Sequence, residues 1–476
     1  MPINLTIKIA GAGLAGTEAA WQCARRGLEV ELYEMRPGRS TPAHQTADFA
    51  ELVCSNSLKS ESENTAPWLL KQEMRIAGSL LLGCARQSVV PAGHALAVDR
   101  GHFSRLVTEA ITAEPRIRIV REEFTRIPDD DARALTVVAT GPLTSDALSA
   151  EIARLSGGSH LYFYDSISPI VEADSIDMSR CYMAARYDKG TADYINCPFT
   201  KEEYERFLAA LAEAQSVEGK DWEKLNYFEG CLPIEEIARR GPETLRFGPM
   251  KPVGLKDPKT GRIPYAVVQL RSESLRADSY NLVGFQNHLR FGEQARVLRL
   301  IPGLENAKFL RFGQIHRNTY INAPTLLKPD LAMRAHGNVY FAGQIAGVEG
   351  YTESIAMGLL AGVHLSARAL GQPLSPAPRA TALGSLVHYI TGAEAKHFQP
   401  ANITFDLLPQ LDEATWRRVR DKKERHTMVC NIALEAMAQW WQTTPATSDP
   451  VYSDPDKDAV AAGALRATAN SPVPLK

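Results

Sequence analysis

Several features that mark particular classes of protein are missing from the sequence. No run of apolar residues approaches the roughly 18 needed to cross a bilayer, which argues against an integral membrane protein. The first residues lead directly into a predicted strand, without the basic segment and apolar core of a secretory signal. Together these absences predict a soluble protein of the cytoplasm.

Cysteine is sparse and shows no metal-binding pattern. The seven cysteines are odd in number, and none belongs to a C-x-x-C pair. This argues against a disulfide scaffold and a zinc site, and it fits a reducing compartment. Net charge is also nearly absent, at -2, so any polyanion must be bound by local basic patches rather than by the whole surface.

The strongest pattern lies in residues 5–34, which read LTIKIAGAGLAGTEAAWQCARRGLEVELYE. A G-x-G-x-x-G motif joins a predicted strand to a predicted helix, and an acid ends the next strand. In such a unit the glycines admit a pyrophosphate at the helix N-terminus, and the acid binds a ribose hydroxyl. The predicted dinucleotide contacts are Gly11, Ala12, Gly13, Leu14, Ala15, Gly16 and Glu34. Lys8 is the one flaw, a charge in a strand that should be apolar on both faces.

Two later segments extend this nucleotide-binding pattern. The strand predicted at 136–138 ends in Ala139, Thr140 and Gly141, an ending that recurs in two-dinucleotide-domain flavoproteins and favours FAD over NAD alone. The strand predicted at 338–341 is followed by AGQIAGVEGYTESIAMGLLAG, which we interpret as a second glycine turn that aims helix amides at the cofactor. The predicted contacts in this turn are Gly343, Gln344, Gly350 and Tyr351.

The chain of 476 residues is long enough for two or three domains. We predict an α/β fold in which a Rossmann-like FAD-binding domain is interrupted by an inserted α+β domain. Residues 1–165 and 280–370 form the two parts of the FAD-binding domain, and residues 166–279 form the insertion. A proline-rich linker leads to a helical segment within 371–442. Residues 443–476 are rich in Ala, Thr, Ser, Pro and Asp, and we expect them to be disordered.

Cys231 lies in a setting typical of a nucleophile. Proline and two acids follow it at a predicted helix start, which places the thiol where the helix dipole stabilises a thiolate. The stretch 239–262 contains seven Lys or Arg against two acids, so Arg239 and Arg240 could bind phosphates beside this thiol. The alternative is that the cysteine is a small buried residue and the charges are a solvated face.

Two further segments carry polar groups suited to a site. Cys54 is flanked by Ser55, Asn56 and Ser57, and Lys59 could stabilise its thiolate. The stretch 314–321 reads QIHRNTYI and contains His316 and Arg317, a grouping suited to a ligand pocket or, as structure alone, to a capped strand end. A basic stretch at 417–425, with six Lys or Arg against two acids, is weak evidence alone.

Six segments together resemble one family, the folate- and FAD-dependent tRNA (uracil-5-)-methyltransferases called TrmFO. They are, in order, IAGAGLAGTEAA, ELVCSNSLKS, EGCLPIEE, IHRNTY, FAGQIAGVEGYTES and FQPANITFDLLP. The resemblance extends to about residue 440.

The resemblance implies an enzyme that methylates C5 of uridine 54 in the T-loop of tRNA. Reduced FAD accepts the methylene of 5,10-methylenetetrahydrofolate on its N5, and NAD(P)H supplies the reducing equivalents. Carried onto this chain, Cys231 is the nucleophile that adds to C6 of the uracil, and Cys54 is the partner that handles the C5 proton. His316, Arg317 and Tyr351 become expected folate or flavin contacts.

Four alternatives remain open from the sequence. The same chemistry could act on a ribosomal RNA uridine. The related FAD-dependent enzymes that install carboxymethylaminomethyl groups on wobble uridines share the cofactor, but they typically have a large helical RNA-binding terminus that this chain lacks. A small-molecule flavin oxidoreductase would leave the basic stretch near Cys231 unexplained. A non-catalytic RNA-binding flavoprotein would tolerate loss of both cysteines.

Overall fold

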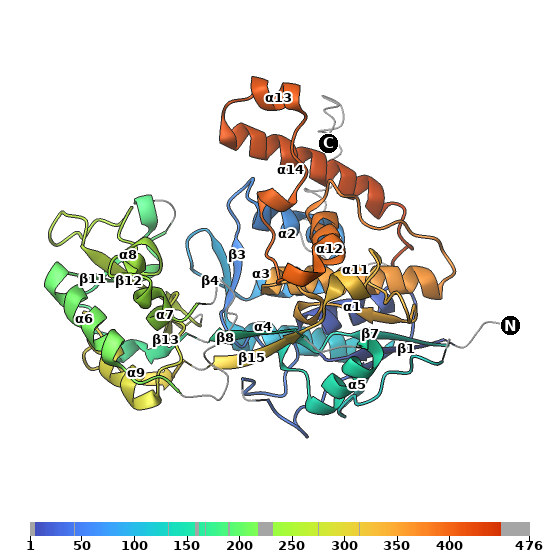
Figure 1. Cartoon of the computed structure of the whole chain (residues 1–476), viewed down its shortest axis with the longest axis horizontal. Coiled ribbons are helices and arrows are strands. Elements are labelled where there is room, and N and C mark those ends of the chain that lie inside the picture. The colour runs from blue at the N-terminus through green and yellow to red at the C-terminus, as the bar shows by residue number, and fades with distance from the viewer. Residues whose placement is uncertain are drawn as a thin grey trace.

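The computed structural model describes residues 5–41, 43–131, 133–157, 161–166, 168–188, 191–217, 232–274, 276–313 and 315–448. Two domains lie side by side, and the helices near the C-terminus pack on the larger one (Figure 1). A two-stranded antiparallel ribbon of β8 (Leu161–Ser166) and β15 (Ile315–Tyr320) carries the chain between the two domains.

The larger domain is built on a five-stranded sheet in the order β16-β7-β1-β2-β6, with all neighbours parallel. Its strands are β1 (Thr6–Ala10), β2 (Val30–Tyr33), β6 (Ile117–Val120), β7 (Ala134–Val138) and β16 (Val339–Phe341). The chain moves outward from β1 to β2 and β6, then returns to the other side of β1 as β7. This reversal places a crevice at the carboxyl ends of β1 and β7, where open α/β sheets bind ligands.

The charge in β1 is part of a row across three strands. Lys8 is in register with Glu31 of β2, and Glu31 is in register with Arg118 of β6. The Lys8 ammonium lies 3.6 Å from a Glu31 carboxylate oxygen, and Arg118 pairs with the other oxygen. The side chain of Lys8 keeps 29% of its surface exposed. Its charge is therefore both paired and in contact with water, so the strand tolerates it.

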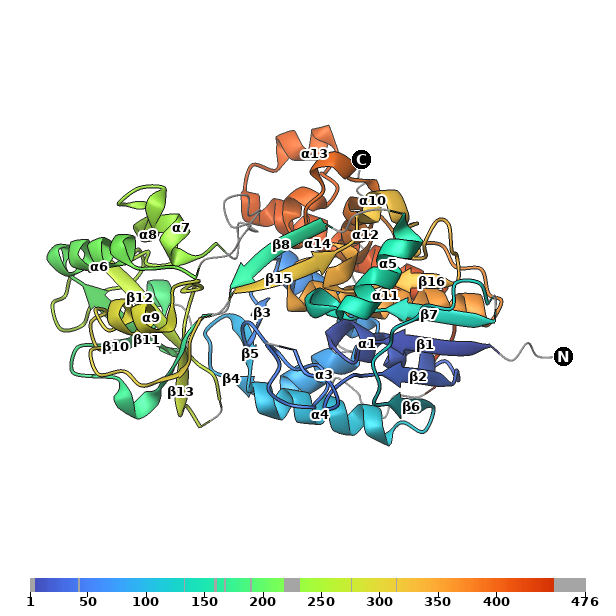
Figure 2. The ribbon, with the colours of Figure 1, turned by 60° about the horizontal axis from the view of Figure 1, so that its bottom comes forward.

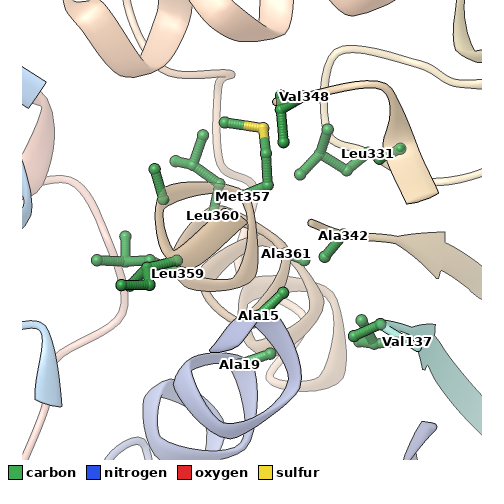
Figure 3. Close-up of a cluster of buried hydrophobic side chains, with 14 of the residues drawn as sticks. Ala15, Ala19, Val137, Leu331, Ala342, Val348, Met357, Leu359, Leu360 and Ala361 are labelled. Carbon is green, nitrogen blue, oxygen red and sulfur yellow. The ribbon is translucent and has the colours of Figure 1, made fainter. Parts of the chain in front are cut away.

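Small residues let two central helices pack closely. Helix α1 (Leu14–Ala24) crosses α11 (Tyr351–Ala369), and Figure 3 shows Ala15 and Ala19 of α1 facing the buried side chains of α11. A Cβ on Gly358 would lie 2.2 Å from the carbonyl oxygen of Ala15. The helix backbones therefore touch, and this contact positions the starts of both helices beside the same crevice.

The other helices of this domain cover the sheet and support the crevice. They are α2 (Ala66–Ile76), α3 (Leu80–Gln87), α4 (Arg100–Ala113), α5 (Asp146–Ser156), α10 (Ala323–Leu326) and α12 (Ala382–Gly392). A small sheet of β3 (Ser57–Ser60), β5 (Ala95–Val98) and β4 (Val89–Val90) lies beside them. Helices α2 and α3 are separated at Gly78, which adopts a φ of 66° between them.

The second domain has its own sheet and core. Its sheet runs β10-β11-β12-β13-β9-β14, with antiparallel neighbours, and helices pack on it (Figure 2). The strands are β9 (Ile170–Glu172), β10 (Tyr182–Ala184), β11 (Tyr194–Phe199), β12 (Ala266–Ser272), β13 (Ser279–Leu282) and β14 (Phe309–Arg311). The helices are α6 (Lys201–Glu213), α7 (Ile234–Arg239), α8 (Thr244–Phe247) and α9 (Phe291–Leu298).

The expected end of the insertion at residue 279 is too early. Strand β13 pairs with β12 and β9, and β14 pairs with β9, so both belong to the second sheet. Val297 and Leu298 of α9 are buried in the core of this domain. The insertion therefore extends to about residue 313, and the larger domain resumes with β15.

The C-terminal segment folds back over the larger domain as α13 (Glu413–Arg418) and α14 (Lys422–Trp441). The tail expected to be disordered from residue 443 begins with ordered contacts, because the Ser448 amide and hydroxyl both donate to the Arg25 carbonyl. Residues beyond 448 lie outside the described part of the chain. Among the described helices, none has both the length and the apolar character required to cross a membrane.

We expect Gly358→Ala to destabilise the larger domain. The added methyl group would meet backbone atoms of α1 that cannot move aside, and overpacking of this kind costs about 1–3 kcal/mol. Differential scanning calorimetry should show a lower midpoint of thermal unfolding. Gly392→Ala, where the new Cβ meets nothing within 4 Å, is the matched control and should leave the midpoint unchanged or slightly raised. Equal midpoints in the two variants would contradict the close helix contact.

Candidate functional site

The crevice at the sheet reversal is an open cleft with an empty volume of about 1040 Å³. Its walls come from the turns that follow β1, β2, β7 and β16 and from the start of α11. The lining residues include Gly11, Gly13, Leu14, Ala15, residues 33–36, residues 139–145, Gly343, Gln344 and Tyr351. Segments far apart in the chain therefore meet here, as the parallel sheet requires.

The first glycine turn provides backbone donors rather than side chains. Gly13 caps α1 without a side-chain hydrogen bond, and a Cβ on Gly13 would meet nothing within 4 Å. The empty space beside Gly13 and the free amides of the helix start suit a pyrophosphate. Gly11 and Gly16 have a packing role, because a Cβ on Gly16 would lie 1.8 Å from the Gly11 carbonyl oxygen.

Glu34 is a buried carboxylate at the end of β2. One of its oxygens accepts hydrogen bonds from the Arg36 amide at 3.0 Å and the Arg36 Nε at 2.9 Å, and the other accepts from the Ala12 amide at 3.3 Å. Burial alone would raise the pKa of Glu34, but the hydrogen bonds and charge of Arg36 outweigh it and lower the pKa. The group therefore stays ionised, as an acceptor for hydroxyl groups requires.

The second glycine turn closes the opposite wall. Gly343 has a φ of 79°, and a Cβ there would lie 2.8 Å from the Cβ of Ala15, so only glycine lets the turn approach α1. Gln344 donates to Glu349 at 2.9 Å, which braces the turn. Gly350 caps α11 without a side chain, and Tyr351 begins the helix at the cleft.

Tyr351 also holds the loop that contains Cys54. Its hydroxyl oxygen accepts the amide of Cys54 at 2.7 Å and the amide of Ser55 at 3.0 Å. Burial, followed by the neighbouring Cys54, raises the pKa of Tyr351, so the phenol remains neutral. Cys54 is partly exposed, whereas Cys23, Cys84, Cys181, Cys197 and Cys430 are buried.

The inserted domain clamps the same loop from the other side. Asn56, which is fully buried, donates to the carbonyl oxygens of Ser272 at 2.9 Å and Val98 at 3.1 Å. Arg271 donates to the Ser55 hydroxyl at 2.8 Å. These bonds connect residues 216 positions apart, so the two domains jointly determine where Cys54 lies.

Arg100 completes this clamp. Its guanidinium pairs with Glu273 of the inserted domain at 2.5 Å and donates to the carbonyl oxygens of Leu52 at 2.8 Å and Cys54 at 3.3 Å. Through Arg100, Glu273 of the inserted domain is connected to the backbone of Cys54.

Lys59 has a different role from the one expected. Its ammonium donates at 2.6 Å both to Glu353, at the start of α11, and to the side-chain oxygen of Asn402. Lys59 also adopts a φ of 64°, a conformation that few side chains occupy. It ties the Cys54 segment to α11 and to the C-terminal segment.

The structure brings together part of the predicted site. Eight of the predicted cofactor contacts line the cleft, while Ala12, Gly16 and Gly350 support its walls. Cys231 and the side chains of His316 and Arg317 lie outside the described residues, although β15 carries the backbone of the latter two. Arg239 ends α7 of the inserted domain and Arg240 follows it, and neither lines the cleft.

Three residues of the clamp were not predicted from the sequence. Arg100, Arg271 and Glu273 sit in ordinary helix, strand and loop contexts that carry no local signal. Among the described residues, no group of three or more His, Cys, Asp or Glu could hold a metal ion.

We expect Tyr351→Phe to loosen the Cys54 loop. The change removes the acceptor of two amides, and each lost hydrogen bond is worth about 1 kcal/mol, or roughly fivefold in local opening. Hydrogen-exchange mass spectrometry should show at least fivefold faster exchange at Cys54 and Ser55. Tyr389→Phe, which removes a bond to the Gln399 carbonyl elsewhere, should leave this loop unchanged. Unaltered protection in the Tyr351 variant would show that other contacts hold the loop.

Comparisons with known proteins place the chain in a family. The family model described as glucose inhibited division protein A matches residues 6–373. A protein from Koribacter versatilis is 76% identical over 443 residues, which is 93% of this chain and 99% of the relative. One from Bacillus subtilis is 51% identical over 432 residues, or 91% of this chain and 98% of the relative. Both are named methylenetetrahydrofolate--tRNA-(uracil-5-)-methyltransferase TrmFO.

A solved structure agrees on the fold. The Aquifex aeolicus GidA structure in its form II crystal has a TM-score of 0.70 and 16% identity, and the match covers 97% of this chain and 76% of that one. The form I crystal gives a TM-score of 0.68. At 16% identity this similarity shows only the Rossmann-type flavoprotein fold. The assignment to a group within the family rests on the relatives of high sequence identity. The chain therefore belongs to the glucose inhibited division protein A family and, within it, to the TrmFO group.

Proposed function

We propose that this protein is a methylenetetrahydrofolate-dependent tRNA (uracil-5-)-methyltransferase that uses FAD and NAD(P)H and acts on uridine 54 of the T-loop. The observation that carries the proposal is the position of the Cys54 loop. Tyr351 both lines the dinucleotide cleft and binds the amides of Cys54 and Ser55, so the loop that carries Cys54 adjoins the nucleotide site. Relatives at 51–76% identity, which carry this activity in their names, support it.

The residues of the cleft fit FAD. The space beside Gly13 and the start of α1 suit the pyrophosphate, and the ionised Glu34 suits a ribose. Tyr351, next to Cys54, would lie toward the flavin end of the cleft. When bound, the flavin supplies the electrons and carries the one-carbon unit that reaches the uracil.

The chain supplies the groups that make uracil reactive. Carbon C5 of uracil is a poor nucleophile until C6 is saturated, and Cys231 is the thiol that would add to C6. After the carbon is transferred, C5 must lose its proton before aromaticity returns, and Cys54 would accept that proton at its Sγ. Tyr351 and Arg100 support this role, because they hold the backbone of Cys54 through its amide and its carbonyl oxygen.

The target base must leave its stack to reach this site. A uridine within an RNA loop is accessible only when it is unstacked and turned into a pocket. The clamp formed by Asn56, Arg100 and Arg271 holds the Cys54 loop in place while the base enters. His316 and Arg317, on a ribbon that joins the two domains, remain proposed folate contacts, and Arg239 and Arg240 remain proposed RNA contacts.

We expect Gly13→Ala to weaken FAD binding without unfolding the protein. The new Cβ meets no protein atom within 4 Å, but it occupies the space where a pyrophosphate would approach the backbone. Titration of the apoprotein with FAD, followed by flavin fluorescence, should give at least tenfold weaker binding. Gly292→Ala, also free of contacts and on α9 of the inserted domain, should bind normally. Unchanged affinity in the Gly13 variant would reject the proposed pyrophosphate site.

We expect a labelled methylene carbon to appear on uridine 54 when the enzyme is given methylenetetrahydrofolate, NAD(P)H and unmodified tRNA. Cys231→Ala should transfer none. Cys54→Ala should also stop turnover, but it should accumulate a protein–RNA adduct, because the C5 proton stays in place and the bond to C6 persists. Cys430→Ala, a buried residue of α14, is the control and should remain active.

Mapping of the labelled nucleotide decides among the alternatives. Label on a ribosomal RNA uridine or on a wobble uridine would redirect the proposal to that substrate. Full activity of Cys231→Ala would remove the proposed nucleophile. Oxidation of NAD(P)H without RNA labelling would support a small-molecule oxidoreductase.

A further inference from the structure

A basic corner lies where α13 meets α14, and we define it as residues 416–425. It holds six Lys or Arg against two acids. Arg418, Arg420, Lys422 and Lys423 are exposed and form no ion pair with any described residue. The chain as a whole carries a charge of only -2, so this corner is a local concentration of unpaired positive charge.

An exposed aromatic ring lies within the same corner. Trp416 keeps 44% of its surface exposed, and the Arg425 guanidinium lies 3.9 Å from the centre of its ring. Arg425 is held in this position by the carbonyl oxygens of Val419 at 2.5 Å and Trp416 at 3.1 Å. Cations combined with an exposed aromatic ring suit RNA, because phosphates pair with the charges and bases stack on the ring.

A continuous set of contacts connects the corner to the Cys54 segment. Asn402 binds Lys59, and the Ile403 amide donates to Glu353 at 3.0 Å. Phe405 is three residues after Asn402, a stretch of chain that spans at most about 11 Å. Its ring stacks on that of His426 of α14, with ring centres 3.7 Å apart. Lys422 is one helical turn, about 6 Å, from His426. The corner is thus fixed rigidly relative to the site.

A second basic surface faces the same side of the molecule. In both views α13 and α14 lie at the top of the larger domain, and α8 lies in the upper part of the inserted domain (Figures 1 and 2). The loop after α8 presents the exposed cations Lys251, Lys256 and Arg262. Phe247, at the end of α8, is 79% exposed. An RNA that extends across the upper side of both domains would therefore meet cations on each.

We propose that the basic corner binds the phosphate backbone of the tRNA substrate, at phosphates outside the uridine that enters the cleft. This inference rests on the proposed function, because it takes RNA as the substrate of the Cys54 site. Its contribution is to affinity and orientation: phosphate contacts set the position of the RNA, while the cleft selects the base.

The test is a charge reversal of three unpaired cations, Arg418→Glu, Lys422→Glu and Lys423→Glu, in one full-length FAD-loaded variant. The logarithm of the tRNA association constant falls with the logarithm of the salt concentration, and each phosphate contact contributes about 0.7–0.9 to the magnitude of this slope. Loss of three contacts should therefore reduce the magnitude of the slope by about two to three. At low salt the Kd for unmodified tRNA should rise at least tenfold. The KM for tRNA should rise in parallel, and kcat at saturating tRNA should stay within twofold of the wild type.

The matched control reverses three other exposed arginines, Arg116→Glu, Arg133→Glu and Arg334→Glu, with the same change in net charge. They precede β6, β7 and β16, at the edge of the sheet opposite the cleft. This variant should keep the wild-type Kd and slope within twofold. Flavin absorbance and thermal unfolding verify that both variants fold.

Each outcome decides a separate point. A corner variant whose Kd, salt slope and KM match those of the control overturns the RNA contact. A corner variant with normal KM but reduced kcat also overturns it, because a binding surface outside the cleft would not alter chemistry alone. Weaker tRNA binding in the corner variant, together with no methyl transfer by the wild type, would reject the proposed function while supporting the contact.

Discussion

The placement of Cys54 depends on one buried network of hydrogen bonds between the two domains. Asn56, Arg100 and Arg271 bind atoms on both sides of the interface, and each is largely removed from water. A buried polar group that loses its partner costs about 1–3 kcal/mol, so the network is stable only when both domains are in place. The loop therefore has a defined position only in the assembled molecule.

The cleft depends on a second constraint, the close approach of backbones at glycine. Gly343 and Gly358 each bring the second half of the larger domain against Ala15, at distances that a side chain would prevent. Because α1 and α11 both begin at the cleft, their contact aims two helix N-termini at one space. An insertion of about 150 residues separates these halves in the chain but does not disturb this contact.

The two constraints meet at Tyr351. Its ring lies at the start of α11 beside the cleft, while its hydroxyl holds the Cys54 loop. Lys59 joins the same loop to Glu353, two residues further along α11, and to the C-terminal segment through Asn402. The nucleotide cleft, the thiol and the basic corner are thus parts of one connected body, which suits a reaction that must align a cofactor with a base in a large RNA.

The sequence by itself determined the local units. The glycine pattern around Gly13, the strand ends at Glu34 and Thr140, and the second turn at Gly343 could all be predicted, because a βα turn encodes its geometry within a few residues. Only the tertiary structure decided which distant units combine. The sequence did not reveal that β13 and β14 join the second sheet, or that Arg100 and Glu273 pair across 173 positions. Such contacts depend on strand pairing and domain packing, and no short-range pattern records which partner a strand end or a buried arginine will meet.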